Sequence, residues 1–186
     1  MADARITLCE VEWNIAWNLR GDPAQSAFVA ESLRLIGIGL PLEPNTTAHR
    51  AGATLLWLGP RSWLVVFQRD VIDGGFDATR ADLNRAGGSL FDLSSSYVGW
   101  KVTGPEVARV LNRGCPLDFH HNTFRAGACA QSMLGHVNAL YYRPAEAVEF
   151  IVMVARSFAI DAWQALCAAA ATEGYRVGPR APFHSA

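Results

Sequence analysis

The chain has 186 residues, of which 51% are hydrophobic and 18% are charged, and its formal net charge is -1. A folded chain of this length buries about 70% of its extended surface, so this composition excludes an intrinsically disordered protein and a large multidomain enzyme. The near-neutral charge, with no basic stripe between aromatic residues, also argues against a nucleic-acid partner.

The apolar runs are too short for a membrane helix. The longest in the middle of the chain, residues 55–67, is broken after Leu58 by Gly59 and Pro60, and a spanning helix needs about 20 apolar residues. No basic region followed by an apolar stretch opens the sequence, so we expect no secretory signal and a cytoplasmic protein.

The four cysteines favour the same compartment. They are widely spaced and form no C-x-x-C motif, which is typical of free thiols in a reducing environment. They are Cys9, Cys115, Cys129 and Cys167.

The first half of the chain begins with a strand and a helix. Apolar residues alternate over residues 15–19, which predicts a half-buried strand. Asp22 can cap the following helix with Pro23 at its first position. A glycine, Gly37 or Gly39, is expected to end that helix in a left-handed conformation. The remaining elements predicted in this half are a hairpin of 55–58 with 63–67, a helix over 77–86 and a strand over 89–93.

The second half predicts the same order of elements. A strand over residues 98–102 is followed by Gly104 and Pro105 at a helix start, and Gly114 is expected to end that helix. Ser157 can cap the last helix. The other elements predicted here are a hairpin of 139–142 with 148–154, the end of the last helix at Gly174 and a strand over 175–177.

Short identities support an internal duplication. Residues 39–43 align with 114–118, and without a gap residues 50–52 then align with 125–127. We therefore predict an α+β fold with two similar strand-helix-hairpin-helix-strand halves. The prediction treats 1–186 as a single duplicated, pseudo-symmetric domain, with halves at about 1–93 and 94–186.

No metal site is expected from the histidines and cysteines. His120, His121, His136, Cys115 and Cys129 lie in one region, but structural zinc sites use close pairs such as C-x2-C with H-x3-5-H. Adjacent histidines in a strand would also point in opposite directions. Loop histidines are the simpler interpretation.

No catalytic residues are predicted either. The serines at 94–96 lack the glycines of a nucleophile elbow, and no phosphate-binding glycine motif is present. Asp92 and Asp118 flank predicted strands, where an aspartate most often bonds to a turn. The sequence by itself therefore indicates a binding module or a subunit rather than an enzyme.

Several segments taken together resemble one known family, the gamma subunits of heterotetrameric sarcosine oxidases. The resemblance covers nearly the whole chain, from about Val29 to Cys167. The segments that carry it are residues 54–66, 90–94, 98–111, 114–118, 129–134 and 156–163.

This resemblance implies a complex that demethylates sarcosine oxidatively to glycine, releasing peroxide and transferring formaldehyde to tetrahydrofolate. The implied partners are the alpha, beta and delta subunits. Flavins and NAD are then expected in alpha and beta, zinc in delta, and no cofactor in this chain. The chain itself is expected to be structural and non-catalytic, and to dock through an apolar surface on the folate-handling part of alpha.

The chain is also similar, more distantly, to the folate-binding domain of the glycine-cleavage T-protein, an aminomethyltransferase. T-proteins place a G-E-D-G type turn before the strand that is predicted here over 148–152. This chain has residues 144–147 at that turn, and only Glu146 offers the acidic contact to a pterin. The alternatives are therefore a free-standing folate-binding protein with Glu146 in its site, or a small aminomethyltransferase.

Overall fold

The computed structural model describes residues 5–67, 75–144 and 148–183. The chain divides into two compact units. One, the continuous unit, comprises residues 13–95, and the other, the split unit, comprises residues 5–12 together with 96–183. Each unit is a mixed α+β structure with one sheet.

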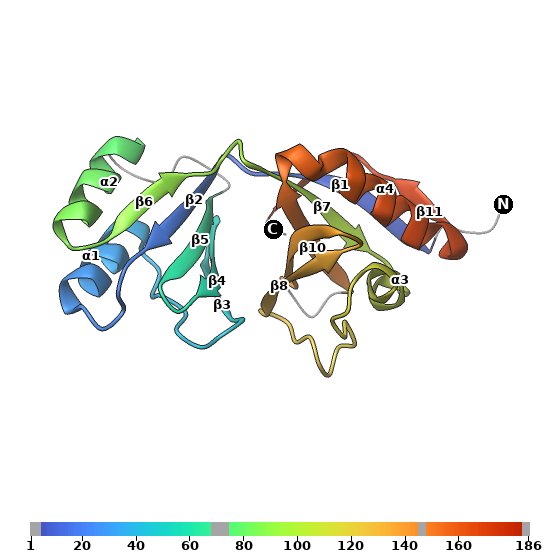
Figure 1. Cartoon of the computed structure of the whole chain (residues 1–186), viewed down its shortest axis with the longest axis horizontal. Helices are drawn as coiled ribbons and strands as arrows, with labels where there is room; N and C mark the ends of the chain where they lie inside the picture. The colour runs from blue at the N-terminus through green and yellow to red at the C-terminus, as the bar shows by residue number, and fades with distance from the viewer. Residues whose placement is uncertain (1–4, 68–74, 145–147, 184–186) are drawn as a thin grey trace. The chain divides into compact units, whose positions relative to one another are not determined.

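The continuous unit has two helices on one face of its antiparallel sheet (Figure 1). The strand order is β3-β4-β5-β2-β6. The helices are α1 (Ser26–Ile36) and α2 (Gly75–Arg85). The strands are β2 (Ile15–Arg20), β3 (Thr47–Arg50), β4 (Ala53–Gly59), β5 (Ser62–Phe67) and β6 (Ser89–Asp92).

Alternate strand residues form the core of this unit beneath the helices. Trp17 and Leu19 of β2 lie beside Trp63, Val65 and Phe67 of β5, as the period of two in a strand requires. The strand predicted over residues 15–19 is therefore confirmed, but it is not half-buried, because Ala16 and Asn18 on its other face are buried as well. The helices contribute Phe28, Ile36 and Leu83 to the same core.

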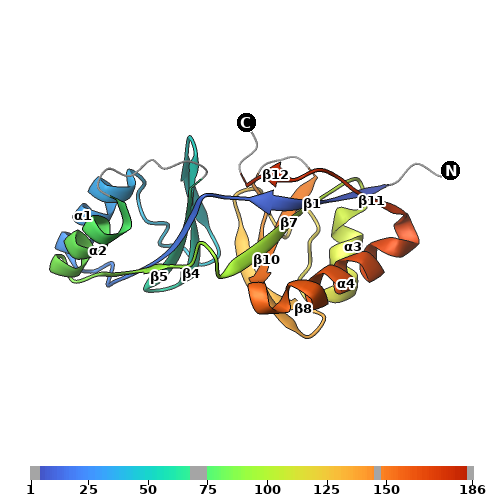
Figure 2. The same ribbon diagram turned by 90° about the horizontal axis from the view of Figure 1, so that it is seen from above.

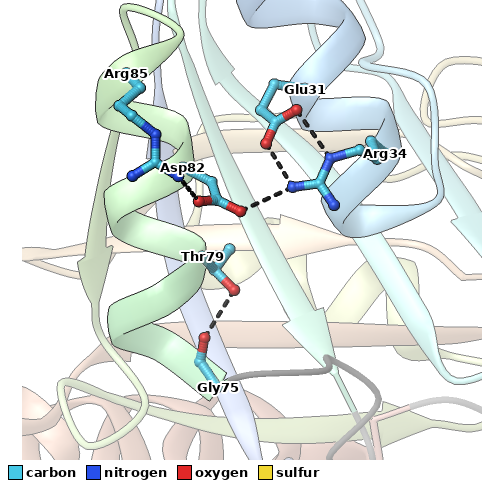
Figure 3. A network of polar contacts seen from close by, with 6 residues as sticks. All are labelled: Glu31, Arg34, Gly75, Thr79, Asp82 and Arg85. Atoms are coloured by element: carbon cyan, nitrogen blue, oxygen red, sulfur yellow. Dashed lines mark hydrogen bonds and ion pairs between the residues drawn. The ribbon is translucent and has the colours of Figure 1, made fainter.

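Polar contacts join the two helices on their exposed side (Figure 3). Arg34 of α1 donates from Nη2 to Glu31 Oε1 at 2.6 Å and to Asp82 Oδ2 of α2 at 2.8 Å. Asp82 also accepts from Arg85. Within α2, the buried Thr79 donates to the carbonyl of Gly75 at 2.8 Å. The contact between Arg34 and Asp82 thus links α1 to α2.

The split unit has the strand order β11-β1-β7-β10-β9-β8, with β12 pairing with β1. Its helices α3 (Val107–Gly114) and α4 (Ala159–Ala170) pack together against the sheet (Figure 2). The strands are β1 (Ile6–Glu12), β7 (Tyr97–Thr103), β8 (Cys129–Leu134), β9 (Val137–Tyr142), β10 (Glu149–Ala155), β11 (Tyr175–Val177) and β12 (Ala181–Pro182).

The first strand, β1, does not belong to the part of the chain that follows it. It pairs antiparallel with β7 and parallel with β11. Residues 5–12 therefore group with 96–183, whereas the halves expected from sequence placed them with the residues up to 93. Among the described residues, the strands that pair with β1 all come much later in the chain.

Four neighbouring strands of one sheet correspond in order to four of the other. The ungapped sequence repeat, however, aligns different strands with one another. The order β3-β4-β5-β2 corresponds to β8-β9-β10-β7, which equates β4 with β9. Aligning residues 50–52 with 125–127 instead places β4 over β8. Gly52 and Gly127 do both have positive φ, at 77° and 74°, so those identities mark similar turns at different places in the two units.

Two expected helix signals act differently in the structure, and a third is confirmed. Asp22 accepts from Ala24 in a turn, and α1 begins only at Ser26 after Gln25. Ser157 lies in the 3-10 turn Arg156–Phe158 that precedes α4 and gives it no side-chain cap. Gly37 has the expected left-handed conformation, with φ 72°.

Gly114 serves packing rather than a left-handed turn. It ends α3, and the next residue, Cys115, is extended. A Cβ on Gly114 would lie 3.1 Å from a methyl carbon of Leu134, and the carbonyl of Gly114 accepts from the N–H of Gly135 at 2.7 Å.

The helices in the described part of the chain include none with the length and hydropathy that a membrane span requires.

Candidate ligand pocket

A loop between α3 and β8 is held in shape by Asp118. Its Oδ1 accepts from the N–H of His120 at 2.9 Å, and its Oδ2 accepts from the hydroxyl of Thr123 at 2.8 Å. These hydrogen bonds, first that from His120, lower the pKa of the Asp118 carboxyl. The interpretation of Asp118 as a turn residue is confirmed, and its carboxylate is committed to the loop.

The same loop presents two adjacent histidines. The ring centroids of His120 and His121 lie 4.2 Å apart. The carbonyl of His120 accepts from the N–H groups of Thr123 and Phe124 at 2.9 and 2.8 Å, so the backbone turns sharply here. Because the residues are in a turn and not in a strand, their side chains do not diverge as the sequence argument assumed.

Arg143 follows β9 and reaches this loop from the sheet. The residue is 6% exposed, and its Nη1 donates to the carbonyl of Phe124 at 2.7 Å. A longer contact of 3.5 Å leads to the carbonyl of His121. The guanidinium also lies over the ring of Phe150, with 5.9 Å from Cζ to the centroid. Arg143 thereby joins the loop to β10.

These groups border a pocket of about 410 Å³ in the split unit. Its walls come from the start of α3, the end of β9, the start of β10 and the histidine loop, by which we mean the loop between α3 and β8 that carries His120 and His121. They are Pro105, Val107, Ala108, Phe119, His120, His121, Arg143, Val148 and Phe150. A pocket of this size with mostly apolar walls and a few polar groups is typical of a site for a small molecule.

Glu146, which the T-protein resemblance suggests as a folate contact, lies outside the described residues. Arg143 and Val148 lie close to it in the sequence and are described. Both line the pocket. His136 is exposed and is not a wall residue.

The serines at 94–96 form a turn, and the cysteines form no disulfide. Ser94 donates from its hydroxyl to Asp92 Oδ1 at 2.6 Å, and its Oγ accepts from the N–H of Ala16 at 3.0 Å. The interpretation of Asp92 as a turn residue is therefore confirmed. All four cysteines are free thiols, and the parts of the chain that the structure describes contain no group of three or more histidine, cysteine or acidic residues arranged to hold a metal ion.

Sequence reasoning missed the charged side chains that the sheet buries. Arg143 carries no motif, and neither do Lys101 of β7 and Glu149 of β10, whose Nζ and Oε2 atoms lie 4.0 Å apart. Both of these residues are less than 10% exposed. The available signal was a charged residue inside an otherwise apolar strand pattern, since such residues are seldom buried without a partner.

Comparison with known proteins gives one family. The model of the sarcosine oxidase, gamma subunit family matches residues 20–172. This match covers most of the chain, including the whole pocket wall.

The chain is similar to a curated relative and to solved structures. The sarcosine oxidase subunit gamma of Corynebacterium sp. (strain U-96) is 28% identical over 142 residues, which is 76% of this chain and 68% of the relative. A structure of heterotetrameric sarcosine oxidase from Corynebacterium sp. U-96, in complex with pyrrole 2-carboxylate, matches with a TM-score of 0.83 and 26% identity, covering 93% of this chain and 88% of that chain.

The second structure shows the fold alone. The glycine cleavage system aminomethyltransferase T from Bartonella henselae has a TM-score of 0.62 at 15% identity. The match covers 95% of this chain but only 48% of that one. The expected T-protein-like fold is thereby confirmed.

Proposed function

The chain belongs to the sarcosine oxidase gamma subunit family, and we propose that it is the structural, non-catalytic gamma subunit of a heterotetrameric sarcosine oxidase. The single observation that carries the proposal is the family match over residues 20–172. The TM-score of 0.83 to a chain of such a complex supports it over nearly the full length.

The proposal includes the partners and cofactors. Alpha, beta and delta subunits would assemble with this chain, with flavins and NAD in alpha and beta, zinc in delta, and formaldehyde transferred to tetrahydrofolate outside this chain. A cytoplasmic complex is part of the same proposal, and the four free thiols support it.

We propose further that residues 1–186 form one duplicated domain. The corresponding strand orders β3-β4-β5-β2 and β8-β9-β10-β7 support a duplication. The helices correspond as well. In one unit α1 follows β2 and α2 follows the hairpin β4–β5, and in the other α3 follows β7 and α4 follows the hairpin β9–β10.

The start of α4 supplies an apolar surface for docking on alpha. Phe158 is 47% exposed and Ile160 is 73% exposed. Large apolar side chains that are exposed on a folded unit are candidates for a protein interface. The docking surface in the proposal is therefore the one around Phe158 and Ile160.

The test is purification of the tagged chain from its own cells. A yellow eluate that contains larger chains and releases peroxide when sarcosine is added is the expected result. A chain that elutes alone and colourless from cells shown to oxidise sarcosine would overturn the proposal.

A pair of variants tests the docking surface. Ile160→Asp puts a charge on that surface and should remove the larger chains from the eluate. Leu42→Asp, which puts the same charge on an exposed apolar residue of the continuous unit, is the matched control and should keep them. Equal recovery of the larger chains with both variants would place the interface elsewhere on the chain.

Folate binding by this chain is a second proposal, and it rests on Glu146. The flanking residues Arg143 and Val148 border a pocket, which favours a ligand near that turn. Titration of the full chain with a reduced folate should show binding that Glu146→Ala abolishes. Unchanged binding in that variant would dismiss Glu146 as the contact.

A further inference from the structure

We propose that a hollow on the sheet of the split unit binds a small molecule in which a primary carboxamide is attached to a flat ring, about the size of benzamide. This hollow, which we call the sheet hollow, has a volume of about 460 Å³ and shares no wall residue with the pocket beside the histidine loop. The wall residues that carry the inference are Tyr97, Met133, Asn138 and Ala155. A ligand at this place goes beyond a structural role in the complex.

The strand register brings three of these residues into one row across the sheet. Tyr97 of β7 pairs with Ala155 of β10. Val154 of β10 pairs with Ala139 of β9, so the next step of the same register places Ala155 beside Asn138. Because Val154 and Ala139 belong to the core that includes α3 and α4, the row itself points from the opposite face of the sheet.

A small side chain lies between two longer ones in this row. Neighbouring strands are about 4.8 Å apart, so Tyr97 and Asn138 are separated by about 10 Å, with the methyl group of Ala155 between them. Ala155 is exposed, whereas Leu140 and Met153 form the next row, are buried and close one end of the hollow. The row therefore leaves room over Ala155 for a planar group that Tyr97 and Asn138 can both reach.

The two polar side chains at the ends of this space are available to a ligand. Among the described residues, the hydroxyl of Tyr97 and the carboxamide of Asn138 make no hydrogen bond with a protein group. Burial raises the pKa of the Tyr97 hydroxyl, so this group has also lost part of its contact with water. A partly buried polar group without a partner gains free energy from a ligand that supplies one.

The chemistry of these two groups selects a carboxamide. A phenol hydroxyl donates one hydrogen bond and can accept others, and an asparagine side chain offers a carbonyl acceptor and two N–H donors. A primary carboxamide has the same two functions. Its carbonyl can accept from the Tyr97 hydroxyl while its N–H group donates to the Asn138 carbonyl, so one planar group satisfies both side chains.

The contacts for a ring come from side chains that still have accessible surface. The ring of Tyr97 and the thioether of Met133, which pairs with Asn138 from β8, are both half-buried. Methionine adapts to the shape of a ligand, and its sulfur makes favourable contacts with aromatic rings. A flat ring attached to the carboxamide can therefore cover apolar surface on both sides of the row.

The backbone that carries Tyr97 is fixed before any ligand arrives. Its carbonyl accepts from Arg156 Nη2 at 2.9 Å, and the N–H of Arg156 donates to the carbonyl of Ser96 at 2.8 Å. These bonds join the start of β7 to the end of β10. Because this part of the site needs no ordering, less of the interaction free energy is lost on binding.

The test compares two probes of the same shape. Benzamide and acetophenone, which lacks the N–H donors, are titrated into the 15N-labelled full chain, and binding is followed by amide chemical shifts. For so small a ligand we expect a Kd on the order of 1 mM for benzamide. Acetophenone should bind about 5-fold more weakly, because the hydrogen bond to Asn138 is lost. The largest shifts should lie in residues 131–133, 138–140 and 153–155.

Two variants locate the site, each with a matched control. Tyr97→Phe keeps the ring and removes the hydroxyl, so benzamide binding should weaken about 5-fold. Tyr175→Phe, at an exposed tyrosine of β11, should leave it unchanged. Ala155→Leu fills the space between Tyr97 and Asn138 and should abolish binding, whereas Ala168→Leu, at an exposed alanine of α4, should not.

Three results would overturn the proposal. One is no shift at 20-fold the expected Kd, about 20 mM. Another is equal affinity for benzamide and acetophenone, since the hollow would then bind any flat ring. The third is unchanged benzamide binding in Tyr97→Phe or in Ala155→Leu. Because these titrations need no partner subunit, their failure is distinct from a failure to purify the sarcosine-oxidising complex.

Discussion

The ring of Phe183 stacks on that of Tyr142, with centroids 5.6 Å apart and planes inclined by 16°. Phe183 is fully buried, and its N–H donates to the carbonyl of Glu12 at 3.0 Å. These two contacts hold the segment that contains β12 on the sheet of the split unit.

Phe183→Ala should therefore lower the free energy of unfolding by about 3–4 kcal/mol, the usual cost of removing a buried aromatic ring. Denaturant unfolding followed by tryptophan fluorescence measures this loss. Phe91→Ala is the control, because Phe91 is 49% exposed, and about 1 kcal/mol or less is expected. Equal losses in the two variants would contradict the importance of the stack.

Gly104 occupies a position that only glycine tolerates. Its φ is 133°, and a Cβ there would lie 2.0 Å from the carbonyl oxygen of Arg5. Gly104→Ala should destabilise the protein by about 2–4 kcal/mol through strain and displacement of the chain before β1. Gly59→Ala is the matched control, because nothing lies within 4 Å of the added Cβ. A Gly104→Ala protein as stable as Gly59→Ala would refute this account.

Arg113 joins α3 to the segment that ends α4. Its Nη1 donates to the carbonyl of Ala169 at 2.7 Å, and its Nη2 to Glu173 Oε1 at 2.6 Å. Arg113→Met should lower the free energy of unfolding by about 1–2 kcal/mol, because a charged donor with two acceptors is removed.

Arg109 offers a control for that change on the same helix. It approaches the same carboxylate, but at 3.6 Å and with its side chain 66% exposed. Arg109→Met should cost less than about 0.5 kcal/mol. Thermal and urea unfolding of the two variants gives the comparison, and a larger loss at Arg109 would reverse the assignment.

The network between α1 and α2 makes part of the stability depend on pH. The hydrogen bond from Arg34 holds the pKa of Glu31 below its usual value of 4.5. A carboxyl with a lowered folded pKa stabilises the fold above its unfolded pKa, and this stabilisation is lost as the pH falls through the folded pKa. Glu31→Gln should therefore lower the Tm by about 1–3 °C at pH 7, and by less at pH 3.

The same network should respond to salt. Its side chains are partly exposed, so added salt screens the ion pairs and reduces the difference between wild type and Glu31→Gln. Glu43→Gln, at an exposed position outside the network, serves as the reference. A Tm difference that persists at pH 3 and in high salt would show that packing, and not charge, is responsible.

Local sequence patterns were sufficient for most helices and for both hairpins, because alternation and glycine ends are local properties. They were not sufficient for β1, β3 and β8. Strand β3 is short and partly exposed, with the sequence Thr-Ala-His-Arg, so it has no apolar period. Strand β1 is placed by pairing with β7 and β11, which no local pattern reports.

The pocket was beyond local reasoning for a similar reason. Four segments of the split unit supply its walls, and their meeting depends on the sheet order. Metal-site spacing gives no reason to bring His120 and His121 together with another residue, and Arg143 lies between two predicted strands with no motif around it. The family resemblance supplied the function, since no motif in the residues carries chemistry that would do so.

The pairing of β1 has a consequence for how the protein forms on the ribosome. Residues 13–95 contain every strand of one sheet, so this unit can fold as soon as it has emerged. Strand β1 emerges earlier but must wait for β7 and β11, so its backbone donors stay open during most of synthesis. Closing that long loop is expected to be the slow step of folding, and the exposed strand is the part of the nascent chain most in need of a chaperone.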